Sequence, residues 1–290
     1  MKPSLKPPFN PSAKTQKVPD AAARPAFPVR LKPDTGVPSA TKLPASSTRP
    51  VVGAGSNVLK KTALAAPTRP GGVGLDSHAV RARMVAKLAA GGVSDPQVLA
   101  AMGLVERHRF VDSALVNQAY EDTSLPIGLG QTISKPNVVA RMIELLRHGA
   151  AGNAGKLGRV LEIGTGCGYQ AAVLSHLATE VYSIERLRGL HYKARENLRT
   201  LRLPNVHLLF GDGMMGFAKG APYAAIIAAA GGEAIPPAWI DQLALGGRLV
   251  APMQTAGGAQ ALVVVDKTPQ GIRQTLLEAV HFVPLKSGTS

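Results

Sequence analysis

The sequence has one cysteine, few acidic residues and no long apolar run. The single cysteine, Cys167, excludes an internal disulfide framework and fits a reducing compartment, so we expect a cytoplasmic protein. The longest obvious apolar run, YAAIIAAA at 223–230, is far shorter than the roughly 18 residues that a membrane-spanning helix needs. Prolines occupy the N-terminal region where a secretory signal would have its continuous apolar segment. The sequence therefore predicts neither a membrane partner nor export.

Basic residues and prolines are concentrated near the N-terminus. Residues 1–72 contain 12 of the 33 Lys and Arg residues, 2 of the 18 Asp and Glu residues and 13 of the 23 prolines. Such a segment cannot bury enough apolar surface to offset the entropy lost when its backbone is ordered. We therefore predict a disordered, Pro- and Lys-rich basic tail over 1–72 and a folded domain over 73–290. A basic arm that binds nucleic acid or anionic lipid is the alternative, which the dispersed charges and the near absence of aromatic residues disfavour.

Strand and helix patterns alternate along the rest of the chain. Buried strands are expected at 159–163, 181–185, 206–210, 224–230 and 247–253, with helices at 168–178, 187–202 and 236–244. This rhythm predicts an α/β fold with a mostly parallel sheet and helices on both of its faces. Closing strands, at least one of them antiparallel, are expected within 261–268 and 276–285. Two helices precede these elements, at 77–92 and 95–105, and Ser94 or Asp95 is placed to cap the second.

Three glycines follow the first of these strands, in the stretch RVLEIGTGCGYQAAVL. Gly164, Gly166 and Gly168 lie between a strand and a helix, where glycine lets a ligand come closer to the backbone than a Cβ permits. The dinucleotide fingerprint G-x-G-x-x-G would place its third glycine at position 169, which is Tyr169. Within the loop, Cys167 is interpreted as a small spacer because no histidine pairs with it in the local sequence. The seven histidines of the chain are scattered without ligand-like spacing, so no metal site is predicted.

Carboxylates near this loop indicate which ligand it holds. Glu162 precedes the glycines, Glu185 ends the next strand, and Asp212 follows the third strand in the sequence GDG. A carboxylate at the end of the second strand can accept hydrogen bonds from both ribose hydroxyls of an adenosine-type cofactor. No Lys or Arg lies in the loop to favour a pyrophosphate. A ligand that has no phosphate and carries a positive sulfonium suits this acidic crevice, and S-adenosylmethionine is such a ligand.

The stretch LPIGLGQTISKPNVVARM, residues 125–142, leads into an amphipathic helix. Pro136 suits the first helical turn, and Ser134 is placed to cap it. An ordinary N-cap is one interpretation of this polar cluster. The other is a site for a substrate carboxylate, because a helix N-terminus offers free amide donors and positive potential.

Taken together, these motifs resemble those of protein-L-isoaspartate O-methyltransferases. The resemblance rests on LPIGLGQTIS, LEIGTGCGYQ, NVHLLFGDG, IPPAWIDQLALGGRLVAPM and HFVPL, and it extends over residues 77–290. It implies a Rossmann-like class I methyltransferase that uses S-adenosylmethionine, with S-adenosylhomocysteine as product, to esterify L-isoaspartyl and D-aspartyl residues of damaged proteins. The resulting methyl ester then proceeds to a succinimide. The resemblance implies the following site residues: Ser134 for catalysis, Gln131, Thr132, Ile133 and Ser134 for the substrate, and Gly164, Thr165, Gly166, Gly168, Glu185, Asp212 and Gly213 for the cofactor.

This chain departs from the family pattern at three places, and two other functions remain open. The departures are Cys167, Ala224 and the pair Gly231 and Gly232. A methyltransferase of RNA, DNA or a small molecule could use the same glycine loop, but the chain lacks an Asn/Asp-Pro-Pro-aromatic motif and its basic charge lies mainly in the tail. A non-enzymatic protein that tethers nucleic acid through the tail is the other possibility. We expect a monomer whose partners are damaged proteins and peptides, with nucleic acid bound, if at all, by the tail.

Overall fold

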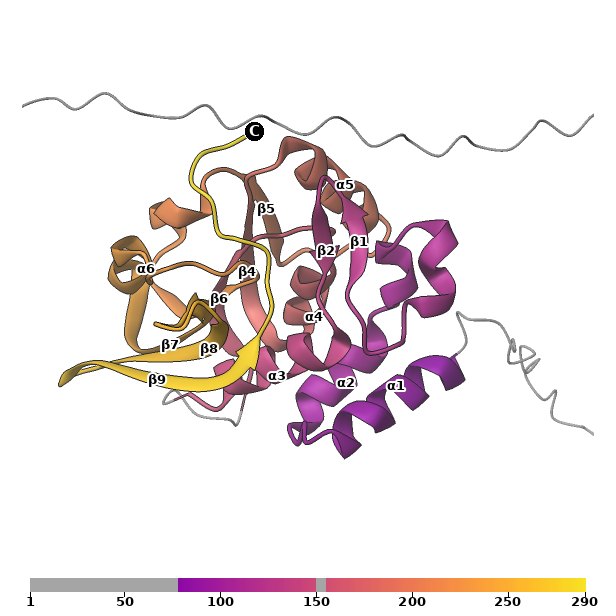
Figure 1. Ribbon diagram of the computed structural model, residues 1–290, viewed down its shortest axis with the longest axis horizontal. Coiled ribbons are helices and arrows are strands. Elements are labelled where there is room, and N and C mark those ends of the chain that lie inside the picture. Colours follow the sequence, from indigo (N-terminus) through magenta and orange to yellow (C-terminus); the bar gives the residue numbers. More distant parts are fainter. Residues whose placement is uncertain (1–77, 150–154) are drawn as a thin grey trace, which may run out of the picture. The chain divides into compact units, whose positions relative to one another are not determined.

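The computed structural model describes residues 78–149 and 155–290 (Figure 1). The predicted tail over 1–72 lies outside these residues. No helix within the described ranges combines the length and the apolar character needed to cross a membrane. All the elements below belong to one compact unit of the chain.

A seven-stranded sheet forms the centre of this unit, in the order β5-β4-β3-β6-β7-β8-β9. Its strands are β3 (Leu157–Ile163), β4 (Ala178–Glu185), β5 (Val206–Phe210), β6 (Tyr223–Ala228), β7 (Leu243–Gln254), β8 (Gln260–Thr268) and β9 (Gly271–Val280). The pairs among β3 to β7 are parallel, whereas β8 pairs antiparallel with both β7 and β9. The strand order switches at β3, because the chain adds β4 and β5 on one side of β3 and then crosses over to add β6 and β7 on the other side. Ligands of open α/β sheets bind at such a switch, beyond the carboxyl ends of the strands.

Apolar side chains alternate along the central strands and so build a core on each face of the sheet. Val160 and Ile227 belong to one buried cluster, whereas Leu161 and Ile226 belong to the other. This alternation is the period of two that a strand buried on both faces requires. The two faces are therefore both covered, as the sequence predicted.

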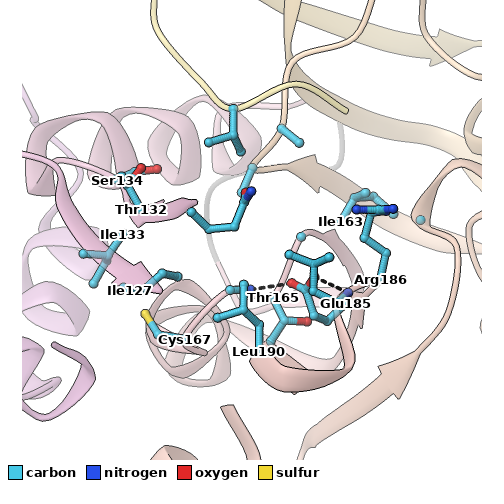
Figure 2. A pocket seen from close by; sticks show the side chains of 18 of the residues that line it. Ile127, Thr132, Ile133, Ser134, Ile163, Thr165, Cys167, Glu185, Arg186 and Leu190 are labelled. Carbon is cyan, nitrogen blue, oxygen red and sulfur yellow. Dashed lines mark hydrogen bonds between the residues drawn. The ribbon is translucent and has the colours of Figure 1, made fainter. Parts of the chain in front are cut away.

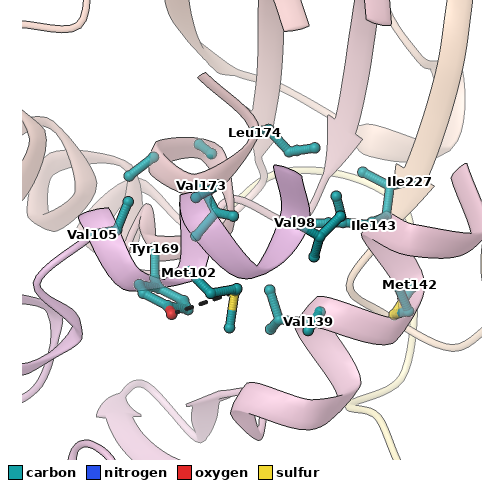
Figure 3. Close-up of a cluster of buried hydrophobic side chains, with 14 of the residues drawn as sticks. Val98, Met102, Val105, Val139, Met142, Ile143, Tyr169, Val173, Leu174 and Ile227 are labelled. Atoms are coloured by element: carbon teal, nitrogen blue, oxygen red, sulfur yellow. Dashed lines mark hydrogen bonds between the residues drawn. The ribbon is translucent and has the colours of Figure 1, made fainter. Parts of the chain in front are cut away.

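Helices cover the two faces unequally. Those that contribute to the first cluster are α1 (His78–Ala90), α2 (Pro96–Leu104), α3 (Pro136–Arg147), α4 (Tyr169–Leu177) and α5 (Arg188–Arg199). Figure 3 shows Val98 and Met102 of α2 among side chains of α3 and α4, including Val139 and Val173. The second face is covered by α6 (Pro237–Gln242), whose Trp239 is fully buried and donates a hydrogen bond to the Gly213 carbonyl at 2.8 Å.

Buried charged groups hold the N-terminal helices to the rest of the fold. Asp95 accepts hydrogen bonds from the Gln97 and Val98 amides and thereby caps α2, as one of the two sequence alternatives proposed. The second oxygen of the same carboxylate accepts a hydrogen bond from Arg147 Nε of α3 at 2.7 Å. The Arg147 partner and the backbone amides lower the pKa of Asp95, although burial acts in the opposite direction and is the largest single effect.

The observed elements match the predicted ones except at two places. The closing strand was predicted within 276–285, but β9 ends at Val280. HFVPL at 281–285 therefore lies outside the sheet strands, contrary to the prediction. The stretch before α3 also differs, because Gln131–Ile133 forms strand β2, which pairs antiparallel with β1 (Leu125–Gly128) in a separate hairpin. The N-cap of α3 is Lys135, so the prediction that Ser134 caps this helix is wrong. With Pro136 as the first helical residue, Ser134 lies one position too far from the helix to be its N-cap.

Candidate functional site

A cavity of about 460 Å³ lies at the carboxyl ends of β3, β4 and β6 (Figure 2). Ile163, Glu185 and Ala229 mark the strand ends that contribute to its wall. Three further segments complete the lining: the β1–β2 hairpin, the glycine loop and the stretch 283–286. The volume lies within the range of about 300–1,000 Å³ that is usual for small-molecule sites.

The glycine loop enters the cavity through two of its three glycines. Gly164 and Gly166 line the cavity and have φ values of +89° and +57°, in the region that glycine adopts without strain. The amides of Gly164 and Thr165 both donate to the Ile184 carbonyl, at 2.9 and 3.1 Å, which ties the loop to the end of β4. These two backbone hydrogen bonds therefore fix the position of the loop at the end of β4.

Glu185 lies below this loop and helps to hold it. One oxygen of its carboxylate accepts a hydrogen bond from the Gly166 amide, and the other accepts one from the Leu187 amide, both at 2.9 Å. Because each carboxylate oxygen has two lone pairs, both retain an acceptor position. Burial raises the pKa of Glu185, and the backbone hydrogen bonds act against this shift. The side chain lines the cavity at the position where the sequence places a ribose acceptor.

Glu162 does not share this position, although the sequence places it beside the glycines. Its side chain is fully buried beneath the loop and accepts a hydrogen bond from the Ser183 hydroxyl. Ser183 also bonds to the Thr165 hydroxyl at 2.6 Å. Burial raises the pKa of Glu162 to about 8. This carboxyl group therefore belongs to a polar network behind the cavity and does not line it.

Two residues expected at the cofactor are also absent from the cavity lining. Gly168 instead packs against α5, where an added Cβ would lie 3.0 Å from Leu198 Cδ1. Asp212 accepts hydrogen bonds from the Met214 amide at 2.9 Å and from the Gly288 amide at 2.7 Å. Its neighbour Gly213 does line the cavity. Gly168 thus serves the packing of α4 against α5, and Asp212 caps the turn that begins at Gly213.

The residues predicted to bind the substrate all line the same cavity: Gln131, Thr132, Ile133 and Ser134. Ser134 is part-buried, and no hydrogen bond to its hydroxyl group is found among the described residues. The first turn of α3 is satisfied differently, because the Asn137 amide donates to Asp122 Oδ1 at 2.9 Å. The Ser134 hydroxyl is consequently available to a ligand, and it faces the same space as Gly164 and Glu185.

One wall of the cavity consists of residues 283–286, for which the sequence predicted no role in the site. This segment is anchored by Gly231, whose amide donates to the Val283 carbonyl and whose carbonyl accepts from the Leu285 amide, both at 2.8 Å. Gln260 holds the preceding residue, accepting from the Phe282 amide at 2.7 Å and donating to its carbonyl at 3.2 Å. A Cβ at position 231 would lie 2.4 Å from Gln260 Nε2, so a larger residue there would displace the Gln260 amide that holds Phe282. These contacts join segments distant in sequence, and no local pattern reveals them.

The other side chains of the cavity suit the predicted cofactor. Ile163, Ile184 and Leu190 provide apolar surface for a planar base, next to the Glu185 carboxylate. The glycine loop itself contains no cation, although Arg186 and Lys286 lie elsewhere in the wall. Burial raises the pKa of the Cys167 thiol to about 11, so this lining residue is a neutral spacer at physiological pH. This set of acceptors and apolar side chains fits a nucleoside ligand.

Comparisons with known proteins agree with this geometry. A family model described as Protein-L-isoaspartate(D-aspartate) O-methyltransferase matches residues 79–290. A protein-L-isoaspartate O-methyltransferase of Methylibium petroleiphilum is 65% identical over 224 residues, which cover 77% of this chain and 82% of that protein. A solved structure of a protein-L-isoaspartate O-methyltransferase aligns with a TM-score of 0.64 and 28% identity, covering 71% of this chain and 66% of that one. A putative protein-L-isoaspartate O-methyltransferase of Plasmodium falciparum, solved with S-adenosyl-L-homocysteine, aligns with a TM-score of 0.59 and 24% identity. The alignment covers 71% of this chain and 98% of that one.

Several predictions from the sequence are confirmed by these matches. The Rossmann-like class I methyltransferase fold is one, and S-adenosylmethionine as the cofactor of this methyltransferase family is another. The enzyme class is the third. The chain therefore belongs to the protein-L-isoaspartate(D-aspartate) O-methyltransferase family.

Proposed function

We propose that this chain repairs damaged proteins by methylating the free carboxylate of L-isoaspartyl and D-aspartyl residues, with Ser134 binding that carboxylate. One observation carries the role of Ser134: its hydroxyl faces the same cavity as the glycine loop and Glu185, and no described residue uses it. Gln131, Thr132 and Ile133 form the wall beside it. The cavity thus has an acceptor-rich end and an end that presents a hydroxyl donor.

The cofactor end is assigned to the glycine loop and the strand that follows it. In this proposal Gly164, Thr165, Gly166 and Gly213 contact the cofactor through their backbone, and Glu185 accepts hydrogen bonds from its ribose. Gly168 and Asp212 act indirectly, by fixing α4 against α5 and by capping the turn at Gly213. When bound, S-adenosylmethionine supplies an electrophilic methyl group.

For this methyl transfer the protein has to bind and orient the two reactants. A carboxylate with a reference pKa near 4 is ionised at neutral pH, so no general base is needed to prepare it. The Ser134 hydroxyl donates a hydrogen bond to one carboxylate oxygen and leaves the other free to react. Holding two reactants in place can lower a barrier by several kcal/mol. Residues 283–286 and the β1–β2 hairpin line the same cavity as this position.

The decisive experiment compares two peptides that differ only in the linkage of one aspartyl residue. Full-length protein is incubated with labelled S-adenosylmethionine and each peptide, and base-labile label is counted. We expect label in the isoaspartyl peptide alone. Equal labelling of both peptides, or label that is stable to base, would refute the assignment.

We also propose that the enzyme acts as a monomer in the cytoplasm and that residues 1–72 take no part in catalysis. The single cysteine supports a reducing compartment. All the cavity-lining residues lie at position 127 or later. A chain shortened to residues 73–290 should methylate a short isoaspartyl peptide at the full-length rate. A filter-binding comparison of the two forms measures whether the basic tail binds nucleic acid.

A further inference from the structure

One buried cation near the site has no role in the function described so far. Arg107 belongs to the 3₁₀ helix η1 (Arg107–Phe110), and its side chain is fully buried. No ion pair joins it to a carboxylate among the described residues, and its Nη1 atom is buried without a hydrogen-bond partner. An isolated buried charge is strongly unfavourable, so this position calls for an explanation.

Arg107 contacts the backbone of Ser134 directly. Nη2 donates a hydrogen bond to the Ser134 carbonyl at 2.7 Å, and Nε donates to the Ala119 carbonyl at 2.8 Å. The guanidinium group thus connects the loop before β1 to the residue between β2 and α3. Because guanidinium is planar and rigid, two such bonds fix the position of the Ser134 backbone more firmly than one flexible donor could.

Tyr169 closes the space between this cation and the cavity. The guanidinium carbon lies 4.8 Å from the centre of the Tyr169 ring, and Phe110 packs edge-on against that ring at 5.5 Å. Tyr169 and Ser134 both line the cavity, whereas Arg107 does not. The positive charge therefore lies one side chain behind the wall where the substrate carboxylate is expected, in a region of low dielectric where charges act strongly.

We propose that Arg107 is a positioning residue for the substrate: it holds the Ser134 segment in place, and its positive charge favours an anion at the Ser134 end of the cavity. This inference rests on the proposed function of Ser134. It explains why this buried cation forms no ion pair with a carboxylate among the described residues, since the substrate supplies the opposite charge. It also predicts that substitution of Arg107 weakens the binding of the peptide and not that of the cofactor.

Arg147 is a matched control for this proposal. It is also a buried arginine, 3% exposed, and it donates to a carbonyl, that of Gly155, as well as to its carboxylate partner Asp95. Arg147 does not line the cavity, and neither do Asp95 and Gly155. Arg147→Met should therefore lower the melting temperature while leaving the KM for the isoaspartyl peptide within about twofold of the wild-type value.

The test measures peptide kinetics and cofactor binding for Arg107→Met and Arg107→Lys in the full chain. We expect the KM for the isoaspartyl peptide to rise at least tenfold in Arg107→Met, with the Kd for S-adenosylhomocysteine within twofold of wild type. Arg107→Lys keeps the charge but not both hydrogen bonds, so its KM should lie between that of the wild type and that of Arg107→Met. An unchanged KM, or a cofactor Kd that rises as much as the KM, would overturn the proposal. If Arg107→Met does not fold, the same two criteria are applied to Arg107→Lys.

A double-mutant cycle with Ser134→Ala tests whether Arg107 acts through Ser134. If it does, Arg107→Lys should lower kcat/KM less in the Ser134→Ala background than in the wild type, because the two residues share one interaction. Equal losses in both backgrounds would contradict a positioning role. Failure of the proposed function would be recognised separately, since Ser134→Ala alone would then retain wild-type turnover.

Discussion

Asp122 Oδ1 accepts a hydrogen bond from the Asn137 amide at 2.9 Å, so a residue fifteen positions upstream satisfies the first turn of α3. Ser134, which is closer in sequence, takes no part in this cap. The helix start and the binding of the substrate are thereby assigned to different side chains. This separation makes it possible to test the two roles independently.

Ser134→Ala should reduce turnover of an isoaspartyl peptide by about 10-fold to 100-fold, because a hydrogen bond to a charged group contributes about 1.5–3 kcal/mol. The melting temperature should stay close to that of the wild type, since the hydroxyl does not cap α3. Asp122→Ala is the matched variant and should lose about 1 kcal/mol of stability through the missing cap. Steady-state kinetics and thermal unfolding of both proteins provide the comparison. A strongly destabilised Ser134→Ala would show that the hydroxyl is structural.

Glu185→Gln should weaken the binding of S-adenosylhomocysteine by about tenfold or more. The substitution removes the charge that accepts bonds from the Gly166 and Leu187 amides and, in our proposal, from the ribose. Isothermal titration calorimetry measures the affinity. Glu278→Gln is the control, because Glu278 pairs with Arg141 outside the cavity lining. Wild-type affinity in Glu185→Gln would remove this residue from the cofactor site.

Glu162 makes the stability of the fold dependent on pH. Its pKa is raised from 4.5 to about 8 by burial, so the folded state binds the proton more tightly than the unfolded state does. The contribution is fully present below pH 4.5 and is lost as the pH rises through 8. Glu162→Gln cannot ionise, so its free energy of unfolding relative to wild type should increase over this range, by up to a few kcal/mol. Urea unfolding at several pH values checks this, and a pH-independent difference would contradict it.

Gln260→Leu should weaken the binding of S-adenosylhomocysteine several-fold. The variant loses both hydrogen bonds to Phe282, so the cavity wall at 283–286 is held less firmly. Asn205→Leu is the control. Asn205 also makes two hydrogen bonds to backbone atoms, the carbonyls of Ser175 and Ala178. None of these three residues lines the cavity. Calorimetry measures the Kd for S-adenosylhomocysteine of both variants under conditions in which their free energies of unfolding are similar. A larger Kd in Gln260→Leu alone indicates an effect on the cavity wall and not a general loss of stability. Equal affinities would show that Gln260 does not support the site.

Local patterns predicted most of the fold. Strand β5 was placed at its observed bounds, 206–210, and the other buried strands were found because their apolar runs are continuous. The failures occurred where distant contacts decide the structure. Gln131–Ile133 becomes a strand because it pairs with Leu125–Gly128, and HFVPL leaves the sheet because Gln260 and Gly231 bind it.

The site shows the same division between local and distant information. Motif and strand position brought Ser134, Glu185 and the first two glycines to one cavity, since the carboxyl ends of parallel strands meet at one edge. The end of the second strand favours Glu185 over Glu162 as the ribose acceptor, and of these two buried carboxyl groups only Glu185 lines the cavity. Arg107 could not be predicted in this way, because its contacts with Ala119 and Ser134 depend on the tertiary fold.

All seven strands of the sheet are complete by Val280, whereas one wall of the cavity consists of residues 283–286. A protease that cuts the backbone between these two regions would leave the strand pairing intact and open the ligand site. Loss of activity during purification or storage would then occur without any sign of unfolding in circular dichroism, and only the mass of the protein would reveal it.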